Sequence, residues 1–104
     1  MKYQYFTFEN KLFKITHTRE TFKRTKTGRN WKSKPTEETR ETVPPEFYEN
    51  FVRSIPFFNG FMGGTCRAEH NYTGAGYIPT KITTISPDRA EKHIDYFTFE
   101  YIGV

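Results

Sequence analysis

The stretch Tyr-Phe-Thr-Phe-Glu occupies residues 5–9 and occurs again, unchanged, at residues 96–100. Successive side chains of a β-strand point to opposite faces, so the two phenylalanines of each copy share one face. Phenylalanine, tyrosine and threonine also favour the pleated surface of a sheet. The two copies therefore predict two strands of one sheet, with their phenylalanine faces in its core.

The composition favours a sheet over a helical bundle. Leu12 is the single leucine, against eleven phenylalanines, seven tyrosines and fifteen threonines. A chain of 104 residues is large enough for one domain with its own core. We expect a single α+β domain over residues 1–104, with a mostly antiparallel sheet of four to five strands, one packed helix and the order ββαβββ.

The expected sheet opens with a hairpin. Residues 3–8 and 12–17 alternate in a way that puts their strongest apolar side chains on one face. A two-residue turn at residues 10–11 would place Phe8 opposite Phe13. A three-residue loop would satisfy the same pattern.

The best helix candidate is the segment 46–55. Its apolar residues recur at i, i+3, i+4 and i+7, which is the spacing of one buried stripe: Tyr48, Phe51, Val52 and Ile55. Pro56 should end this helix, because proline lacks the amide hydrogen that a helix interior needs. The polar segment 33–42 and the glycine-containing segment 57–64 are expected to be loops.

Further strands are expected in the C-terminal part, residues 65–102. Alternation predicts strands at 65–72 and 77–86, joined by a glycine turn, and a last strand at 93–102. Pro79 near the start of the second of these indicates an edge position or a bulge. The last strand has apolar residues on both faces, so we expect it at the centre of the sheet, with the helix on one side.

A block of positive charge interrupts this scaffold. Seven cations against Glu20 alone give residues 19–34 an excess of +6, which leaves −2 for the rest of a chain whose net charge is +4. The cations are Arg19, Lys23, Arg24, Lys26, Arg29, Lys32 and Lys34. We expect a basic β-ribbon or loop over about residues 18–34 that extends from the sheet, turns near Gly28 and returns through Trp31.

Clustered lysines and arginines attract polyanions and neutralise phosphates, and aromatic rings stack on unpaired bases. We therefore predict a non-enzymatic binding protein that contacts a nucleic acid, DNA or RNA, or a nucleoprotein. The seven cations would contact phosphates, and Trp31 would stack on a base or anchor the ribbon on the domain. A solvated basic hairpin without a ligand would explain the same charge.

A protein-binding inhibitor or adaptor is one alternative. Small inhibitors encoded by mobile genetic elements, which block larger nucleic-acid enzymes, can be basic and rich in aromatic strands, and the ribbon would then dock on an acidic protein surface. An exposed edge strand would also offer a route to a homo-oligomer.

A small ribonuclease is the second alternative. Acid–base cleavage of RNA needs a proton acceptor, a proton donor and nearby cations, and Glu69 and His93 are the candidate acid–base residues. Residues 71–73 after Glu69, together with the late segment 93–99, resemble the microbial guanyl-specific ribonucleases, which use a strand glutamate as base and end in a histidine-bearing strand. The histidine spacing departs from that family, and its helices precede the sheet where this chain has a hairpin.

Several classes of site have no support in the sequence. Three scattered histidines and the single cysteine, Cys66, lack the ligand-pair spacing of zinc sites, so we expect no metal and no cofactor. One cysteine cannot form an internal disulfide and fits a reducing compartment. No apolar run approaches the ~20 residues needed to span a membrane, and the N-terminus lacks the shape of a signal peptide. We expect a cytoplasmic protein without a membrane partner.

Overall fold

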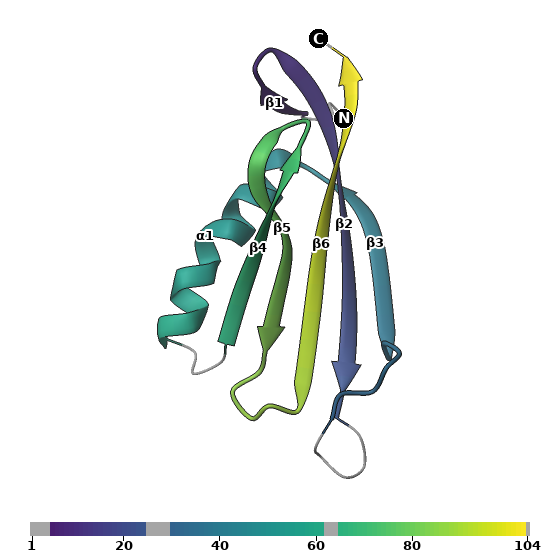
Figure 1. Ribbon diagram of the computed structural model, residues 1–104, viewed down its shortest axis with the longest axis vertical. Helices are drawn as coiled ribbons and strands as arrows, with labels where there is room; N and C mark the ends of the chain where they lie inside the picture. Colours follow the sequence, from purple (N-terminus) through teal and green to yellow (C-terminus); the bar gives the residue numbers. More distant parts are fainter. Residues whose placement is uncertain (1–4, 25–29, 62–64, 104) are drawn as a thin grey trace.

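The structure is a computed structural model that describes residues 5–24, 30–61 and 65–103, without the side chains of residues 56–61. An antiparallel sheet and one packed helix form the described part of the chain, which confirms the predicted α+β class (Figure 1). The elements are β1 (Phe6–Phe8), β2 (Lys11–Lys23), β3 (Glu37–Val43), α1 (Pro45–Phe61), β4 (Thr65–Thr73), β5 (Gly76–Ile85) and β6 (Glu91–Gly103).

Strand β6 lies at the centre of the sheet, as its two apolar faces predicted. It pairs with β2 on one side and with β5 on the other, and β4 follows β5 at one edge. Strands β1 and β3 share the far edge of β2, β1 along residues 11–13 and β3 along residues 15–21. The long β2–β6 pair therefore carries the other strands.

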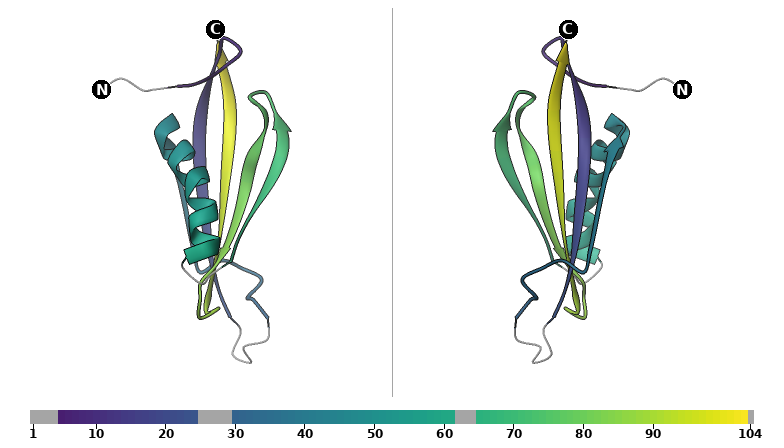
Figure 2. Two further views of the ribbon diagram at one scale, coloured as in Figure 1. Left: turned by 90° about the vertical axis from the view of Figure 1, so that its left-hand side faces the viewer. Right: turned by 90° about the vertical axis from the view of Figure 1, so that its right-hand side faces the viewer.

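The hydrophobic core lies between the sheet and α1, which packs on one face only (Figure 2). Its buried cluster consists of Ile15, Val43, Tyr48, Ile82 and Phe97, and the partly buried Phe6 and Phe99 pack against it. The phenylalanine faces of the repeated stretch thus contribute to the core, as predicted. We call the face that carries Ile15, Ile82 and Phe97 the helix face, and the opposite face, which carries Lys81, Tyr96 and Lys92, the open face.

The opening hairpin turns one residue earlier than predicted. Glu9 and Asn10 form the turn, and both have positive φ, 49° and 64°, as a type I′ turn requires. Phe8 consequently pairs with Lys11, so the predicted pairing of Phe8 with Phe13 is wrong. Each residue of β1 pairs with a residue of β2 two positions earlier than predicted. Because side chains alternate with a period of two, this shift leaves every side chain on its predicted face.

Strand β3 replaces much of the loop predicted at residues 33–42, so that prediction is wrong. Six of its seven residues are exposed and only Val43 is buried. The strand forms because its backbone pairs with β2 from residue 37 to residue 43. A polar edge strand that is exposed on both faces lacks the alternation by which strands are recognised in a sequence. The acidic residues of this segment, Glu37, Glu38 and Glu41, lie beside β2, opposite Thr21, Glu20 and His17.

Helix α1 begins at Pro45 and continues past Pro56 to Phe61, so the predicted stop at Pro56 and the start of the loop at residue 57 are wrong. Proline removes one hydrogen bond from the helix, but its fixed φ is itself helical. The stripe that packs on the core before Pro56 anchors the helix on which the later residues continue. Within the described residues, no helix is long and apolar enough to cross a bilayer.

Strands β4 and β5 and the turn between them agree with the sequence prediction. Pro79 lies opposite His70, at the point where the register of the pair shifts between Glu69 and His70. The predicted irregularity at Pro79 is therefore confirmed. Proline has no amide hydrogen for the ladder, so a bulge is one of the few places where a strand accepts it.

The basic segment leaves the sheet later than predicted. Strand β2 stays paired with β6 through Lys23, so residues 18–23 belong to the sheet and not to an extension. Beyond Lys23, Arg24 forms an isolated antiparallel bridge with Trp31, which confirms the return through Trp31. Residues 25–29, which include the predicted turn, lie outside the described residues.

Candidate functional site

The bridge between Arg24 and Trp31 brings a cation onto an indole ring. The Cζ atom of Arg24 lies 4.0 Å from the centroid of the Trp31 ring, a cation–π distance. The Nε atom of Arg24 also donates a hydrogen bond of 2.9 Å to the carbonyl oxygen of Arg89 in the turn before β6. The ring and the carbonyl together orient the guanidinium group.

Lys92 reaches the same place from β6, because the sheet register pairs it with Phe22. Its Nζ atom lies 4.9 Å from the centroid of the Phe22 ring and 5.3 Å from that of Trp31. Phe22 is buried and Trp31 is half-buried. Both rings are therefore in contact with cations of this chain.

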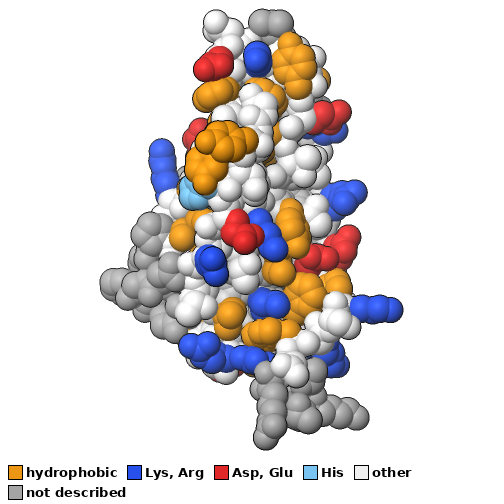
Figure 3. All heavy atoms as spheres, viewed as in Figure 1, with side chains coloured by type: hydrophobic (Ala, Val, Ile, Leu, Met, Phe, Trp, Pro, Cys, Tyr) orange, Lys and Arg blue, Asp and Glu red, His pale blue; other side chains and the backbone are white. Residues whose placement is uncertain are grey.

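Two exposed lysines follow Trp31 in the returning segment, Lys32 and Lys34. The amide of Lys32 donates a hydrogen bond of 2.9 Å to the carbonyl oxygen of Lys23, which holds this segment beside the end of β2. Lys and Arg side chains gather at this end of the open face, among hydrophobic side chains (Figure 3). We call this group the basic end; it consists of Phe22, Arg24, Trp31, Lys32, Lys34, Arg89 and Lys92.

The predicted nucleic-acid-binding residues do not all lie at the basic end. Arg24, Trp31, Lys32 and Lys34 lie at the basic end, whereas Arg19 lies on the helix face, with Nε 3.7 Å from Oδ1 of Asp95. Lys23 forms an ion pair with Glu91, which offsets its charge. Lys26 and Arg29 lie outside the described residues.

The sequence prediction missed Arg89 and Lys92. They follow the basic block by more than fifty residues and stand among acidic neighbours, Asp88 and Glu91. No local signal distinguishes them. Only the pairing of β2 with β6, by which Phe22 faces Lys92, would have brought them to the site.

A buried polar pair lies on the helix face. Asp95 is fully buried, and its Oδ1 accepts a hydrogen bond of 2.7 Å from Nε2 of His17. The His17 ring stacks on Phe97, with ring centroids 4.9 Å apart, and also contacts Phe47 and Phe51. His17 is only 5% exposed, so the pair is closed to solvent and lies within the core.

His93 occupies the next position along this face. Its Nδ1 lies 3.0 Å from Oγ1 of Thr21, and its Nε2 lies 3.7 Å from Oε2 of Glu91. Burial lowers the pKa of His93 below its usual value, and the positive charge of Arg19 lowers it further. The hydrogen bond and the charge of Lys23 lower the pKa of Glu91. His93 is therefore neutral, and Glu91 ionised, at neutral pH.

The structure does not bring together the acid–base residues of the ribonuclease alternative. Glu69 lies on the open face, where its Oε2 is 3.6 Å from Nζ of Lys81. Lys81 pairs with Tyr96, and His93 is three residues from Tyr96 on the same strand. An odd separation along a strand means opposite faces. Glu69 and His93 are thus on opposite sides of the sheet.

The single cysteine has no features of a nucleophile. Its Sγ lies 3.7 Å from Oγ1 of Thr84, and burial raises the pKa of the Cys66 thiol. A thiol with a raised pKa stays protonated at neutral pH, and the thiolate is the reactive form. In the described ranges, no group of three or more His, Cys, Asp and Glu side chains could hold a metal ion.

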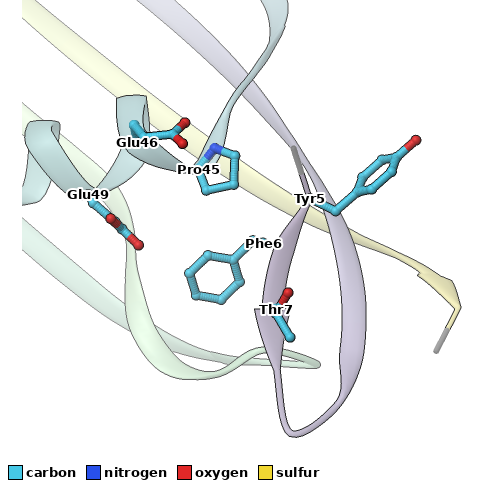
Figure 4. A pocket seen from close by; sticks show the side chains of 6 residues that line it. All are labelled: Tyr5, Phe6, Thr7, Pro45, Glu46 and Glu49. Atoms are coloured by element: carbon cyan, nitrogen blue, oxygen red, sulfur yellow. The ribbon is translucent and has the colours of Figure 1, made fainter. Parts of the chain in front are cut away.

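An open cleft of about 500 Å³ lies between β1 and the start of α1. Figure 4 shows the Phe6 ring directed into it, the side chains of Glu46 and Glu49 on its helix side, and Tyr5 pointing away from the helix. Pro45 and Thr7 complete the lining. Two carboxylates repel phosphates, so this cleft does not suit a nucleic acid.

A comparison of the chain with protein-family models, with curated proteins and with solved structures found no match.

Proposed function

We propose that this is a non-enzymatic binding protein that contacts a nucleic acid, free or within a nucleoprotein, through the basic end. The observation that carries the proposal is that cations from three separate segments lie at one end of the sheet, where two of them, Arg24 and Lys92, contact aromatic rings. Arg24 comes from the end of β2, Lys32 and Lys34 from the returning segment, and Arg89 and Lys92 from the turn before β6 and its first residues. Such a concentration of like charge attracts a polyanion.

The geometry of Arg24 also favours phosphate binding. Its Nε–H is used by the Arg89 carbonyl and one face of its guanidinium covers Trp31. The edge formed by the two terminal nitrogens has the fork geometry that matches a phosphate. Because the side chain is already ordered, binding costs less conformational entropy than it would for a flexible arginine.

The number of cations sets the expected salt dependence. The basic end has five, namely Arg24, Lys32, Lys34, Arg89 and Lys92. If each neutralises one phosphate, the slope of log affinity against log salt is about −3.5 for a single strand and about −4.5 for duplex DNA. A protein partner recognised mainly by apolar contacts would show a much weaker dependence.

The test compares two variants, each of which lacks two exposed lysines. One pair lies in the returning segment at the basic end, and the other lies at the start of β2. Lys32→Ala/Lys34→Ala changes the basic end, and Lys11→Ala/Lys14→Ala removes the same charge at the start of β2. Fluorescence anisotropy with labelled DNA and RNA, single-stranded and duplex, should show weaker binding and a slope reduced by about 1.4 to 1.8 only for the first variant.

Four results would contradict the proposal. One is a wild-type protein that binds none of these nucleic acids, and another is an equal loss of affinity in both variants. The third is a stable protein complex that survives nuclease treatment and needs the basic end, which would favour the inhibitor or adaptor alternative. Cleavage of the labelled RNA that His93→Ala abolishes would favour the ribonuclease alternative.

A further inference from the structure

The hairpin of β4 and β5 carries a cluster of exposed aromatic rings, formed by His70, Tyr72 and Tyr77. The ring centroids of Tyr72 and Tyr77 are 4.6 Å apart, and those of His70 and Tyr77 are 5.5 Å apart with an interplanar angle of 27°. Tyr72 is 87% exposed and Tyr77 is 58% exposed. The rings contact one another and leave most of their surface to solvent.

This tyrosine cluster faces the same side of the sheet as the basic end. Ile78 of β5 packs against the core cluster and therefore lies on the helix face. Successive residues of a strand point to opposite faces, so Tyr77, the residue before Ile78, points to the open face, and Tyr72, which pairs with Tyr77, shares that face. Lys81 and Lys92 also lie on the open face. Figure 3 shows hydrophobic side chains in the upper part of this face and Lys and Arg at its lower end.

The two groups of aromatic residues differ in availability. Phe22 and Trp31 are already covered by Lys92 and Arg24, whereas the cluster has no cation over its rings among the contacts of the described residues. Tyr72 and Tyr77 can therefore accept flat, apolar partners, which the rings of the basic end cannot. Nucleic-acid bases stack on exposed aromatic side chains without requiring a particular sequence.

We propose that the open face selects single-stranded nucleic acid, with bases stacked on Tyr72 and Tyr77 and phosphates of the same strand at the basic end. This inference rests on the proposed function. A duplex offers its phosphates but keeps its base faces inside the stack, so only a single strand can use both groups of residues. Ile85 pairs with Lys92, so the length of β5 from Tyr77 to Ile85 approximates the distance from the tyrosine cluster to the basic end. That length is about 26 Å at ~3.3 Å per residue. Roughly eight nucleotides with B-form spacing cover the same distance.

The experiment measures the anisotropy of a labelled 15-nucleotide single strand and of the corresponding duplex. The wild-type protein should prefer the single strand. Tyr72→Ala/Tyr77→Ala should weaken single-strand binding roughly 5- to 150-fold for each base stack lost, with an unchanged salt slope because no charge is removed. Duplex affinity should stay the same, and Tyr72→Phe/Tyr77→Phe should retain single-strand binding.

Tyr101→Ala is the matched control. The exposed fraction of Tyr101, 56%, is similar to the 58% of Tyr77. Tyr101 lies on the helix face, however, where it pairs with Phe13. Its replacement should leave both affinities unchanged.

The outcomes separate this inference from the proposed function. If Lys32→Ala/Lys34→Ala weakens binding while Tyr72→Ala/Tyr77→Ala does not, the basic end binds nucleic acid and the single-strand inference is wrong. Equal wild-type affinity for the single strand and the duplex would also overturn it. Loss of a nuclease-resistant protein complex in the tyrosine variant, with single-strand affinity intact, would identify the cluster as a protein contact instead. A wild-type protein that binds neither probe would overturn both proposals.

Discussion

Replacing Asp95 by alanine should remove a large part of the free energy of unfolding. Asp95 is fully buried on the central strand, accepts the hydrogen bond from His17 and lies 3.7 Å from the guanidinium of Arg19. Without the carboxylate, the His17 ring loses its hydrogen-bond partner among phenylalanines, and Arg19 loses its nearest negative charge. Nδ1 of His17 already has no hydrogen-bond partner among the described residues.

The expected loss follows from the burial of the pair. A buried polar group that loses its hydrogen-bond partner costs about 1–3 kcal/mol, and more where a charged group is involved. The total free energy of unfolding of a domain of this size is about 5–15 kcal/mol. With a urea dependence of roughly 2 kcal/mol per molar, a loss of about 3 kcal/mol lowers the unfolding midpoint by about 1.5 M.

Urea denaturation at neutral pH, followed by circular dichroism, measures this shift. Glu69→Ala is the control, because Glu69 also pairs with a cation, Lys81, but is about half exposed, and exposed pairs contribute at most about 1 kcal/mol. The double variant His17→Phe/Asp95→Leu replaces the pair by apolar side chains and should recover most of the stability lost by the alanine variant. If Asp95→Ala shifts the midpoint no more than Glu69→Ala does, the reasoning about the buried pair is refuted.

Two further predictions concern pH. The pKa of His93 is lowered by burial in the folded state, so its contribution to stability is complete above the unfolded value of about 6.5 and is lost as the pH falls toward the folded pKa. His93→Gln should remove this part of the pH dependence of the urea unfolding midpoint. His70→Gln, at an exposed position, should retain it. Identical pH profiles for the wild type and His93→Gln would contradict the prediction. Burial raises the pKa of Tyr48 to about 12, so its contribution is complete below about pH 10 and is lost between there and pH 12. Ultraviolet titration of the wild type should show a tyrosine that ionises near pH 12, and Tyr48→Phe should remove that step. The same variant should lose about 1 kcal/mol of stability with the 2.8 Å hydrogen bond to the Pro79 carbonyl. A titration curve that Tyr48→Phe leaves unchanged near pH 12 would show that the assignment is wrong.

Elements with a periodic pattern of buried side chains were predictable from the sequence. The alternation around Phe97 identified the central strand, and the stripe from Tyr48 to Ile55 identified the helix. Strand β3 was not predictable, because six of its seven side chains are exposed and backbone pairing with β2 alone forms it. The continuation of α1 past Pro56 was not predictable, because proline locally disfavours a helix interior and only the packing of the preceding turns on the core overrides it.

The candidate site was predictable only in part. The excess of cations in residues 19–34 pointed to the correct end of β2, since charge density is visible without a structure. The direction of each side chain was not visible. Arg19 and Arg24 belong to the same basic block, but one lies beside the buried Asp95 and the other covers Trp31.

The sequence by itself therefore determined the aromatic strands, the helix stripe and the concentration of positive charge, because these depend on the spacing of residues near one another in the chain. The tertiary structure decided which residues share a face. The β2–β6 register brings Lys92 to Phe22, seventy residues earlier, and the β4–β5 hairpin places Tyr72 and Tyr77 on the same open face. Cross-strand pairing is set by the packing of the whole sheet, so no local pattern could have specified these contacts.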